Sequence, residues 1–309
     1  MYKRLYIKEN KSHKKIKDII VLILLLSIII SHNQRNIKVC LCVIAKNENL
    51  YIKEFVEHYK NIGYNKIFLY DNNQSGENFG DVIKDEIING FVEVINFKNI
   101  NLNSSPQLEA YKDCYYKNNK IFNWLSFFDV DEYLEINKKY KNIKYFLNDK
   151  IFKNCQNIKI NWLIYLDKNK LFYENKPLQK RINVFRYDDP VNVHIKSTVK
   201  GGLLTNYWDK AGTPHSSGLN ITSCSSSGKI IEFDSPFNNQ PDYTNAKLKH
   251  YSYKSFEEYC LKLKKGRADC TKNKGEKIIH ETFKGLYFKI KNNPEKLKIF
   301  NRIFNDSTF

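Results

Sequence analysis

Apolar positions between residues 38 and 128 alternate between strand-like and helix-like spacing. Residues 38–45 (KVCLCVIA) form a short apolar run rich in β-branched side chains, which is typical of a buried strand. Four apolar residues then recur at the spacing of one helix face: Ile52, Phe55, Val56 and Tyr59. Gly63 follows them, and a glycine just beyond the last turn predicts the end of that helix.

The same alternation continues downstream. Further strands are predicted at 66–70, 91–97 and 124–128, and further helices at 79–89 and 107–118. Strands that alternate with helices in this way favour a mostly parallel sheet with helices on both faces. The sequence therefore predicts an α/β fold for this part of the chain.

The second half has shorter apolar runs. Strands are predicted near 156–165, 182–187, 193–200 and 229–233, and the serine-rich stretch 222–228 is predicted to be an exposed loop. Two helices follow. The first begins at Ser255, because Ser255 and Glu258 have the spacing of a capping box, and the second covers 276–291.

A basic segment precedes an apolar stretch near the N-terminus. Residues 19–30 (IIVLILLLSIII) are interrupted only by Ser27 and follow seven Lys and Arg residues, which predicts a cytoplasmic N-terminus. An uncleaved signal anchor is favoured, because no small-x-small cleavage site follows. A cleaved signal peptide and an interfacial or buried helix stay open, because 12 residues are fewer than a bilayer span needs.

Lysine and arginine outnumber the acidic residues and give a formal net charge of +18. The lysines are spread along nearly the whole chain, which favours a generally basic solvated surface over a dedicated polyanion site. The chain has no helix-turn-helix, zinc-finger or RNA-recognition signature, so no nucleic-acid partner is expected.

Seven cysteines are present, and none forms a CxxC pair. This spacing argues against zinc ribbons and thioredoxin-like redox sites. Cys40 and Cys42 alternate with Leu41 in an apolar run, so core packing is the simplest interpretation of both. Disulfides stay possible, but the spacing does not choose their pairs.

Polar side chains follow the predicted parallel strands: Glu48, Asp71, Asn73, Asp129 and Asp131. Ligands of such sheets bind at the carboxyl ends of the strands. Asp129 and Asp131 are two residues apart and project to the same side, which makes an oxygen site suited to Mg²⁺ or Mn²⁺ holding a diphosphate. The alternative is a solvated acidic turn.

Two more groups are candidates for that site. His250 offers an imidazole as a third metal ligand, although a lone histidine is more often structural. Lys264, Lys265 and Arg267 lie at the end of the capped helix. There they either complement the helix dipole or contact a diphosphate.

Several separated motifs resemble glycosyltransferase family 92 and related family-2-like enzymes. They are VCLCVIAKNENLYIKEFVEHYKNIGYNKIFLYDNN, PQLEAYKDC, WLSFFDVDEYL, INW and HYSYKSFEEYCLKLKKGRAD, in this order between residues 38 and 270. The resemblance implies the GT-A fold, a nucleotide-sugar donor such as a UDP-sugar, and a glycan or glycoconjugate acceptor. Galactose is the first sugar it suggests.

The resemblance also implies roles for individual residues. Glu48, Asp71 and Asn73 would hold the nucleotide. Asp129 would bind ribose and, with Asp131 and His250, the metal ion. Lys265 and Arg267 would contact the diphosphate. Asn161-Trp162 is followed by LIYLDKNK without a glycine, so this acceptor-side region departs from the relatives.

The domain organisation expected from the sequence has four parts. They are a basic cytoplasmic tail at 1–18, a signal-anchor or transmembrane segment at 19–31, a GT-A domain at 36–292 and a C-terminal tail at 293–309. The chain is then a single-pass type II membrane protein, facing the ER or Golgi lumen if the source is eukaryotic.

The expected reaction is an inverting hexosyl transfer in which an Asp or Glu removes the proton of the acceptor hydroxyl. Asp167 and Asp209 are the candidates for this base, and the sequence does not decide between them. The alternative function is a GT-A scaffold that binds glycans without catalysis.

Overall fold

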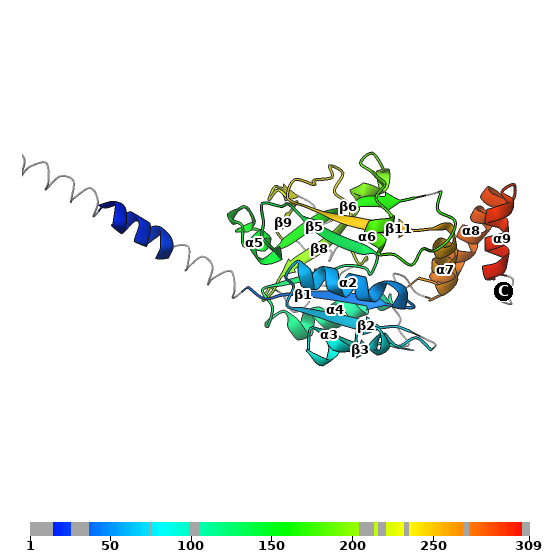
Figure 1. Ribbon diagram of the computed structural model, residues 1–309, viewed down its shortest axis with the longest axis horizontal. Coiled ribbons are helices and arrows are strands. Elements are labelled where there is room, and N and C mark those ends of the chain that lie inside the picture. The colour runs from blue at the N-terminus through cyan, green and yellow to red at the C-terminus, as the bar shows by residue number, and fades with distance from the viewer. Residues whose placement is uncertain are drawn as a thin grey trace, which may run out of the picture.

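The protein was analysed as a computed structural model, which describes residues 15–25, 37–73, 76–98, 105–167, 169–203, 213–215, 221–231, 235–267 and 272–304. Figure 1 shows an α/β body with a cluster of helices at one end.

A large mixed sheet runs through the body in the order β10-β9-β6-β8-β4-β1-β2-β3. Its strands are β1 (Val39–Ala45), β2 (Lys66–Asp71), β3 (Val92–Asn96), β4 (Trp124–Phe127), β6 (Asn157–Leu166), β8 (Ile195–Lys200), β9 (Ser223–Cys224) and β10 (Ile230–Ile231). β4, β1, β2 and β3 are parallel to one another, whereas β8 runs antiparallel between β4 and β6. The parallel sheet predicted from the first half of the chain is confirmed.

A second set of pairings extends from the long strand β6. The strands involved are β5 (Glu132–Ile136), β7 (Phe185–Arg186) and β11 (Ala246–Tyr253). β11 lies between β5 and β6, antiparallel to the first and parallel to the second. This arrangement brings the C-terminal half of the chain back beside the acidic residues that follow β4.

Helices cover both faces of the parallel strands, as predicted. They and the short 3-10 turns are α2 (Asn49–Asn61), η1 (Phe79–Asp81), α3 (Lys84–Ile88), α4 (Pro106–Asn118), α5 (Ile143–Leu147), η2 (Lys150–Phe152), α6 (Leu178–Arg181), η3 (Pro190–Val193), α7 (Phe256–Lys265), α8 (Lys272–Ile290) and α9 (Pro294–Phe304). Gly63 follows α2 with φ 98°, a conformation that favours glycine, and Ser255 and Glu258 form the predicted capping box of α7.

Successive side chains of β1 enter two different cores, because the side chains of a strand alternate between faces. Val39, Leu41 and Val43 pack in the cluster that includes α2, and Cys40 and Cys42 pack in the cluster that includes α4. Both cores are therefore built on the same short run of sequence.

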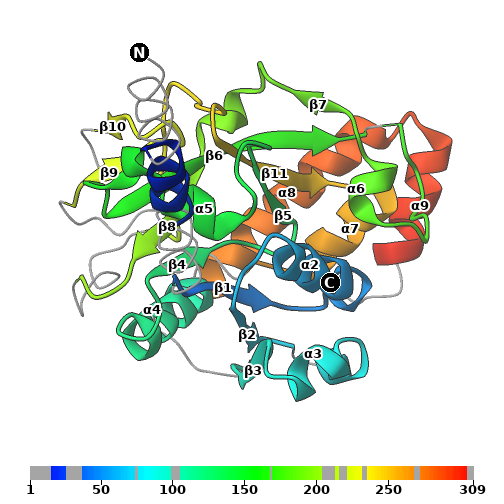
Figure 2. The same cartoon turned by 60° about the vertical axis from the view of Figure 1, so that its left-hand side comes forward.

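A third cluster joins the C-terminal helices. Phe256 and Cys260 of α7 pack with Ile299, Phe300 and Ile303 of α9. Figures 1 and 2 both show α7, α8 and α9 together at one end of the body. α9 lies within the stretch 293–309 expected to be a tail, and the buried face of α9 makes it part of this helical cluster.

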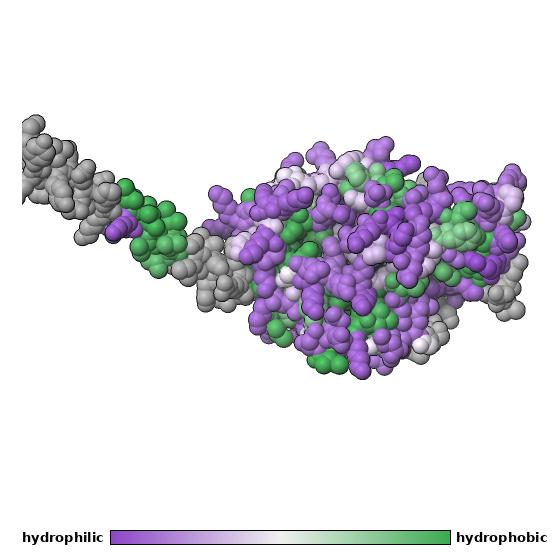
Figure 3. All heavy atoms as spheres, viewed as in Figure 1, coloured by the Kyte–Doolittle hydropathy of each residue, from purple (hydrophilic) through white to green (hydrophobic). Residues whose placement is uncertain are grey.

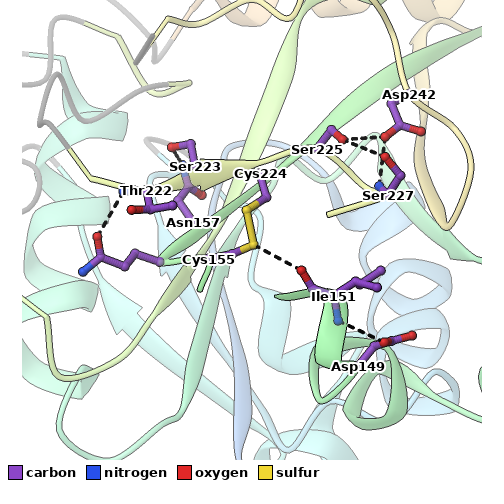
Figure 4. Close-up of a disulfide and its surroundings, with 11 residues drawn as sticks. Asp149, Ile151, Cys155, Asn157, Thr222, Ser223, Cys224, Ser225, Ser227 and Asp242 are labelled. Atoms are coloured by element: carbon purple, nitrogen blue, oxygen red, sulfur yellow. Dashed lines mark hydrogen bonds between the residues drawn. A yellow bond between two sulfur atoms is a disulfide. The ribbon is translucent and has the colours of Figure 1, made fainter. Parts of the chain in front are cut away.

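Disulfides join Cys42 to Cys114 and Cys155 to Cys224 among the described residues. The first ties β1 to α4, and the second ties the segment just before β6 to β9 (Figure 4). The interpretation of Cys42 as a core thiol is therefore incomplete, because its buried sulfur is half of a disulfide. Cys40 and Cys260 are buried free thiols, and Cys270 lies outside the described residues.

The serine-rich stretch 222–228 is not the exposed loop predicted from its composition. Ser225 and Ser226 are buried and hydrogen bond to Asp242, whose carboxylate also accepts from the Ser227 amide (Figure 4). The prediction failed because the hydroxyls are satisfied by a partner 15 to 17 residues away, which composition does not show.

The localisation expected from the sequence, a single-pass type II membrane protein, is contradicted. No helix within the described ranges has the length and apolar character to cross a membrane. Of the expected segment 19–31, residues 26–31 lie outside the described residues, and residues 19–25 belong to a helix of residues 15–25. Figure 3 shows the apolar side chains of this helix exposed.

Candidate active site

Six of the eight predicted site residues line one cavity of about 890 Å³. They are Glu48, Asp129, Asp131, His250, Lys265 and Arg267. The cavity opens where β1 and β4 end, because these two parallel strands deliver the residues that follow them to the same edge of the sheet. Asp71 and Asn73 are not among its lining residues.

The pairing of β11 places His250 beside Asp131. His250 lies opposite Glu132 of β5 and Ile164 of β6, and the amide of the next residue, Tyr251, donates to the Asp131 carbonyl at 2.9 Å. Residues 119 positions apart in sequence therefore share one end of a sheet.

Asp131 is buried between a cation and a neutral imidazole. Lys262 Nζ, on α7, donates to Asp131 Oδ2 at 2.7 Å, and His250 Nε2 lies 3.7 Å from Oδ1. Burial alone would raise the pKa of Asp131, but the charge and hydrogen bond of Lys262, together with further positive charge that includes Lys254, outweigh burial and hold that pKa well below its usual range. Burial lowers the pKa of His250 to about 3, so His250 is neutral at pH 7.

Asp129 is held by different partners. Lys196 Nζ donates to Asp129 Oδ2 at 2.9 Å, while Gln107 donates to Oδ1 at 2.5 Å and the Tyr111 hydroxyl to Oδ1 at 3.3 Å. Lys196 is fully buried. Burial would lower its pKa, but the carboxylates of Asp129 and Glu132 outweigh that effect and raise it.

Glu48 and Lys265 form an ion pair across the cavity between the start of α2 and the end of α7. Glu48 Oε2 is buried, and it has no hydrogen-bond partner among the described residues. Lys46 also lines the cavity, and burial together with the charge of Lys265 lowers its pKa. This side of the cavity is suited to a ligand that carries both acceptors and donors.

Asp71 and Asn73 hold the turn that carries Lys46 and Glu48 through hydrogen bonds. The Asn73 side chain accepts the Asn47 amide at 2.6 Å, and Asp71 accepts the Asn73 amide at 2.9 Å. Asn47 has φ 51°, a left-handed conformation that asparagine tolerates better than most residues. Asp71 also pairs with Lys98 at 2.9 Å. Both residues thus shape the turn that presents Lys46 and Glu48.

Comparison with known families decides what kind of chain carries this cavity. The sequence profile of glycosyltransferase family 92 matches residues 35–201, which is more than half of the chain. The chain belongs to glycosyltransferase family 92. The matched range contains β1 to β8, Glu48, Asp129 and Asp131, whereas β11, α7 and His250 lie beyond it.

Individual relatives of this family 92 chain are distant. A family 92 protein of Ricinus communis is 28% identical over 104 residues, which are 32% of this chain and 17% of the relative. A family 92 protein of Arabidopsis thaliana is 26% identical over 102 residues, 31% of this chain and 16% of the relative. The chain thus matches about a sixth of the length of each.

A solved structure, HddC from Yersinia pseudotuberculosis, covers 71% of this chain and 89% of its own at 12% identity, with a TM-score of 0.32. A score this low does not indicate a shared fold. The assignment to family 92 therefore stands on the sequence profile and on the family 92 relatives.

Sequence reasoning missed the two lysines that hold the acidic pair, Lys196 and Lys262. Each lies in an element that was predicted, but nothing in a chain with 51 Lys and Arg residues distinguishes these two from solvated ones. Of the acidic residues proposed as the base, Asp167 is not among the lining residues of the cavity, and Asp209 lies outside the described residues.

The acidic and imidazole side chains of the cavity bear on whether it fits a divalent cation. No cluster of three or more Asp, Glu, His or Cys ligands occurs within the described part of the chain. Asp131 and His250 nonetheless suit one. The first is ionised, the second is neutral with Nδ1 buried and unpaired, and their 3.7 Å separation exceeds a hydrogen bond. Mg²⁺ typically takes one or two carboxylates and completes its shell with substrate phosphates.

Proposed function

We propose that this chain is a glycosyltransferase that moves a hexose from a nucleotide-sugar to a hydroxyl of a glycan or glycoconjugate. Galactose from UDP-galactose is the first donor to test. The observation that carries the proposal is the cavity itself. In a family 92 chain, the predicted site residues that line one space at the carboxyl ends of the strands are three carboxylates, an imidazole and two cations, and they come from separate elements.

The donor would lie between β1 and α7. Glu48 has an unpaired buried oxygen that suits a nucleotide hydroxyl or ring N–H, and Asp129 suits the ribose. Lys265 and Arg267 lie at the end of α7 and supply positive charge for the diphosphate. Lys265 reaches this position already paired with Glu48, so donor binding would exchange one charged partner for another.

Asp131 and His250 would hold Mn²⁺ or Mg²⁺, with Asp129 as a further ligand if its carboxylate releases Lys196 or Gln107. Such an ion, when bound, neutralises charge on the departing diphosphate. Lys262 keeps Asp131 ionised, and the low pKa of His250 keeps its ring nitrogen free of a second proton. These two residues are therefore in the protonation states that ligation requires.

The transfer is proposed to invert the anomeric carbon. A single displacement needs one base near the acceptor hydroxyl and places it on the side of the sugar opposite the diphosphate. The cavity is also lined by Trp162, His194 and His215, whose rings contact one another. This part of the lining gives the acceptor a surface to approach.

The test uses the full chain with a panel of UDP- and GDP-sugars, measured with Mn²⁺ and with EDTA. Hydrolysis of one donor that EDTA abolishes is the expected result. The double variant Asp129→Asn with Asp131→Asn should lose this activity, and Asp85→Asn, which alters an exposed carboxylate on α3, should retain it.

Full metal-dependent turnover by the double variant would contradict the metal assignment. The proposal that the chain is an enzyme would be overturned if the parent chain neither hydrolyses any donor nor binds UDP or GDP in a metal-dependent way. That result would favour a glycan-binding protein.

A further inference from the structure

The far side of the cavity is a wall of aromatic and imidazole rings. Trp162 lies 4.1 Å from His250 between ring centroids, and on its other sides it meets His194 in a parallel stack at 4.8 Å and His215 edge-on at 5.3 Å. His215 is therefore one indole ring away from the residue proposed to hold the metal ion. All four side chains line the cavity.

We infer that His215 is the general base that takes the proton of the acceptor hydroxyl, with Nε2 as the accepting atom. The inference rests on the proposed glycosyl transfer and adds to it a residue with a stated role. It replaces the expectation of an Asp or Glu base.

Strand β8 holds His215 through Ile195 and Ser197, which lie on either side of Lys196. His215 Nδ1 lies 2.7 Å from the carbonyl oxygen of Ile195, and the Ser197 hydroxyl donates to the His215 carbonyl at 3.2 Å. The residue between them, Lys196, sends its side chain to Asp129. One rigid strand therefore sets the place of the imidazole and of the first carboxylate of the acidic pair together.

The bond to Ile195 also selects the tautomer. A carbonyl oxygen only accepts, so Nδ1 carries the hydrogen and Nε2 carries the lone pair. Nε2 makes no hydrogen bond to another described residue, and the His215 amide is held by the Thr213 hydroxyl at 3.0 Å. A backbone-anchored imidazole with one nitrogen free is the arrangement a general base needs.

The groups that face His215 favour its neutral form. Burial, then the charge of Lys196, lowers the pKa of His215 to about 4, against opposing contributions from the Ile195 carbonyl and Asp129. His194 faces it from the end of η3, and Trp162 faces it from β6. At pH 7 the imidazole is therefore neutral, and the lone pair of Nε2 is available.

The carboxylates of the cavity are less suited to this role. Asp129 and Asp131 are paired with lysines, and Glu48 is paired with Lys265. Asp189 also lines the cavity, where its Oδ1 caps η3 by accepting the Val191 amide at 3.0 Å. Asp189 is therefore the competitor that an experiment has to separate from His215.

In the inferred step, the acceptor oxygen forms a bond to the anomeric carbon as its proton moves to His215 Nε2. The bond between the anomeric carbon and the diphosphate oxygen breaks, and its electron pair leaves with the nucleoside diphosphate. No oxidant or further reactant is needed.

The matched variant is His215→Asn, because the asparagine amide can still donate to the Ile195 carbonyl but offers no nitrogen at the Nε2 position. Turnover, measured as hydrolysis of the donor identified with the parent chain and as transfer to a panel of methyl hexosides, should fall about 10²- to 10⁴-fold. The dissociation constant for UDP with Mn²⁺ should stay unchanged. Added imidazole should restore part of the activity of His215→Ala, as expected for a lost base.

Two controls separate the alternatives. His194→Asn removes a second imidazole of the wall that is not a proposed metal ligand, and it should lower turnover less and show no imidazole rescue. Asp189→Asn should likewise retain turnover with the donor. If His215→Asn does not fold, His215→Gln with the same measurements replaces it.

Wild-type turnover in the His215 variants, or loss of turnover in Asp189→Asn alone, would overturn the inference and leave the proposed function intact. A parent chain that neither binds nor hydrolyses any donor would instead overturn the proposed function, and the inference with it.

Discussion

Lys262 and Asp131 form an ion pair of 2.7 Å although 131 residues separate them in the sequence. The pair joins α7 to the turn that follows β4, and α7 in turn packs on α9. The C-terminal helices are thereby tied to the acidic end of the parallel strands. This contact closes the cavity on the side of Lys265.

Lys262→Met is expected to destabilise the fold, because it leaves the buried Asp131 carboxylate without its cation. A hydrogen bond to a charged group contributes about 1.5 to 3 kcal/mol, and a loss of this size is expected in urea unfolding at pH 7. Lys53→Met, on the exposed face of α2, is the control and should have little effect. A Lys262→Met variant as stable as the parent chain would show that solvent satisfies Asp131.

Two neighbouring glutamates of α7, Glu257 and Glu258, each pair with an arginine, and one pair is buried while the other is exposed. Arg181 and Glu258 are fully buried and joined by two hydrogen bonds of 2.5 and 2.8 Å, whereas the Arg302 side chain of the second pair is 57% exposed. Arg181→Met should cost about 3–5 kcal/mol, because the Glu258 carboxylate stays buried without its cation.

Arg302→Met, which breaks the pair with Glu257, should cost less than about 1 kcal/mol. The free energies of unfolding of both variants are to be measured by chemical unfolding under the same conditions. Similar losses for the two variants would mean that burial does not govern the strength of these pairs.

Protonation of the buried His58 should lower the stability of the fold at acidic pH. Its ring lies between the Leu134 carbonyl, 2.9 Å from Nε2, and the Gln179 amide, 3.2 Å from Nδ1, and burial lowers its pKa from 6.5 to about 4. Because the unfolded chain then binds a proton that the folded chain does not, the free energy of unfolding falls as the pH falls from 6.5 toward 4.

The contribution of His58 over this range is about 3 kcal/mol. His58→Gln, which can donate to the same carbonyl without titrating, should lose this part of the pH dependence in urea unfolding series. An unchanged pH profile in His58→Gln would assign the acid sensitivity to other groups.

The disulfides should contribute strongly to stability because each closes a long loop. Their cysteines are 72 and 69 residues apart, and cross-links over loops of this length contribute about 4 kcal/mol each in the chain-entropy account. Dithiothreitol should therefore lower the unfolding midpoint of the parent chain.

The variant Cys155→Ala with Cys224→Ala should begin at a lower midpoint and fall further with reductant, because Cys42–Cys114 remains. A parent chain indifferent to reductant, in which mass spectrometry finds Cys42, Cys114, Cys155 and Cys224 as free thiols, would contradict the pairing.

The local pattern of residues was sufficient for the parallel half of the fold. β1, α2, β2, β3, α4 and β4 were all predicted, because their signals are local: alternation or helical spacing of apolar residues, a glycine after α2, and a run of β-branched side chains. Parallel strands end at one edge, so the proximity of Glu48 to Asp129 and Asp131 followed from the same pattern.

The pairing of β11 could not be predicted in this way. Its residues AKLKHYSY carry no signal for whether they pair with β5, with β6 or with neither, because strand pairing depends on the packing of segments far apart in sequence. That pairing is what brings His250 to Asp131.

The sequence by itself thus determined the family, the α/β class and the acidic residues at the strand ends, because each depends on residues that are close together in the chain. Only the tertiary structure decided which of many similar lysines hold those acids, which cysteines pair and which imidazole faces the cavity. Lys196, Lys262 and His215 differ from other residues of their types by their partners from distant segments, and Lys196 also by its burial; both features arise when the chain packs.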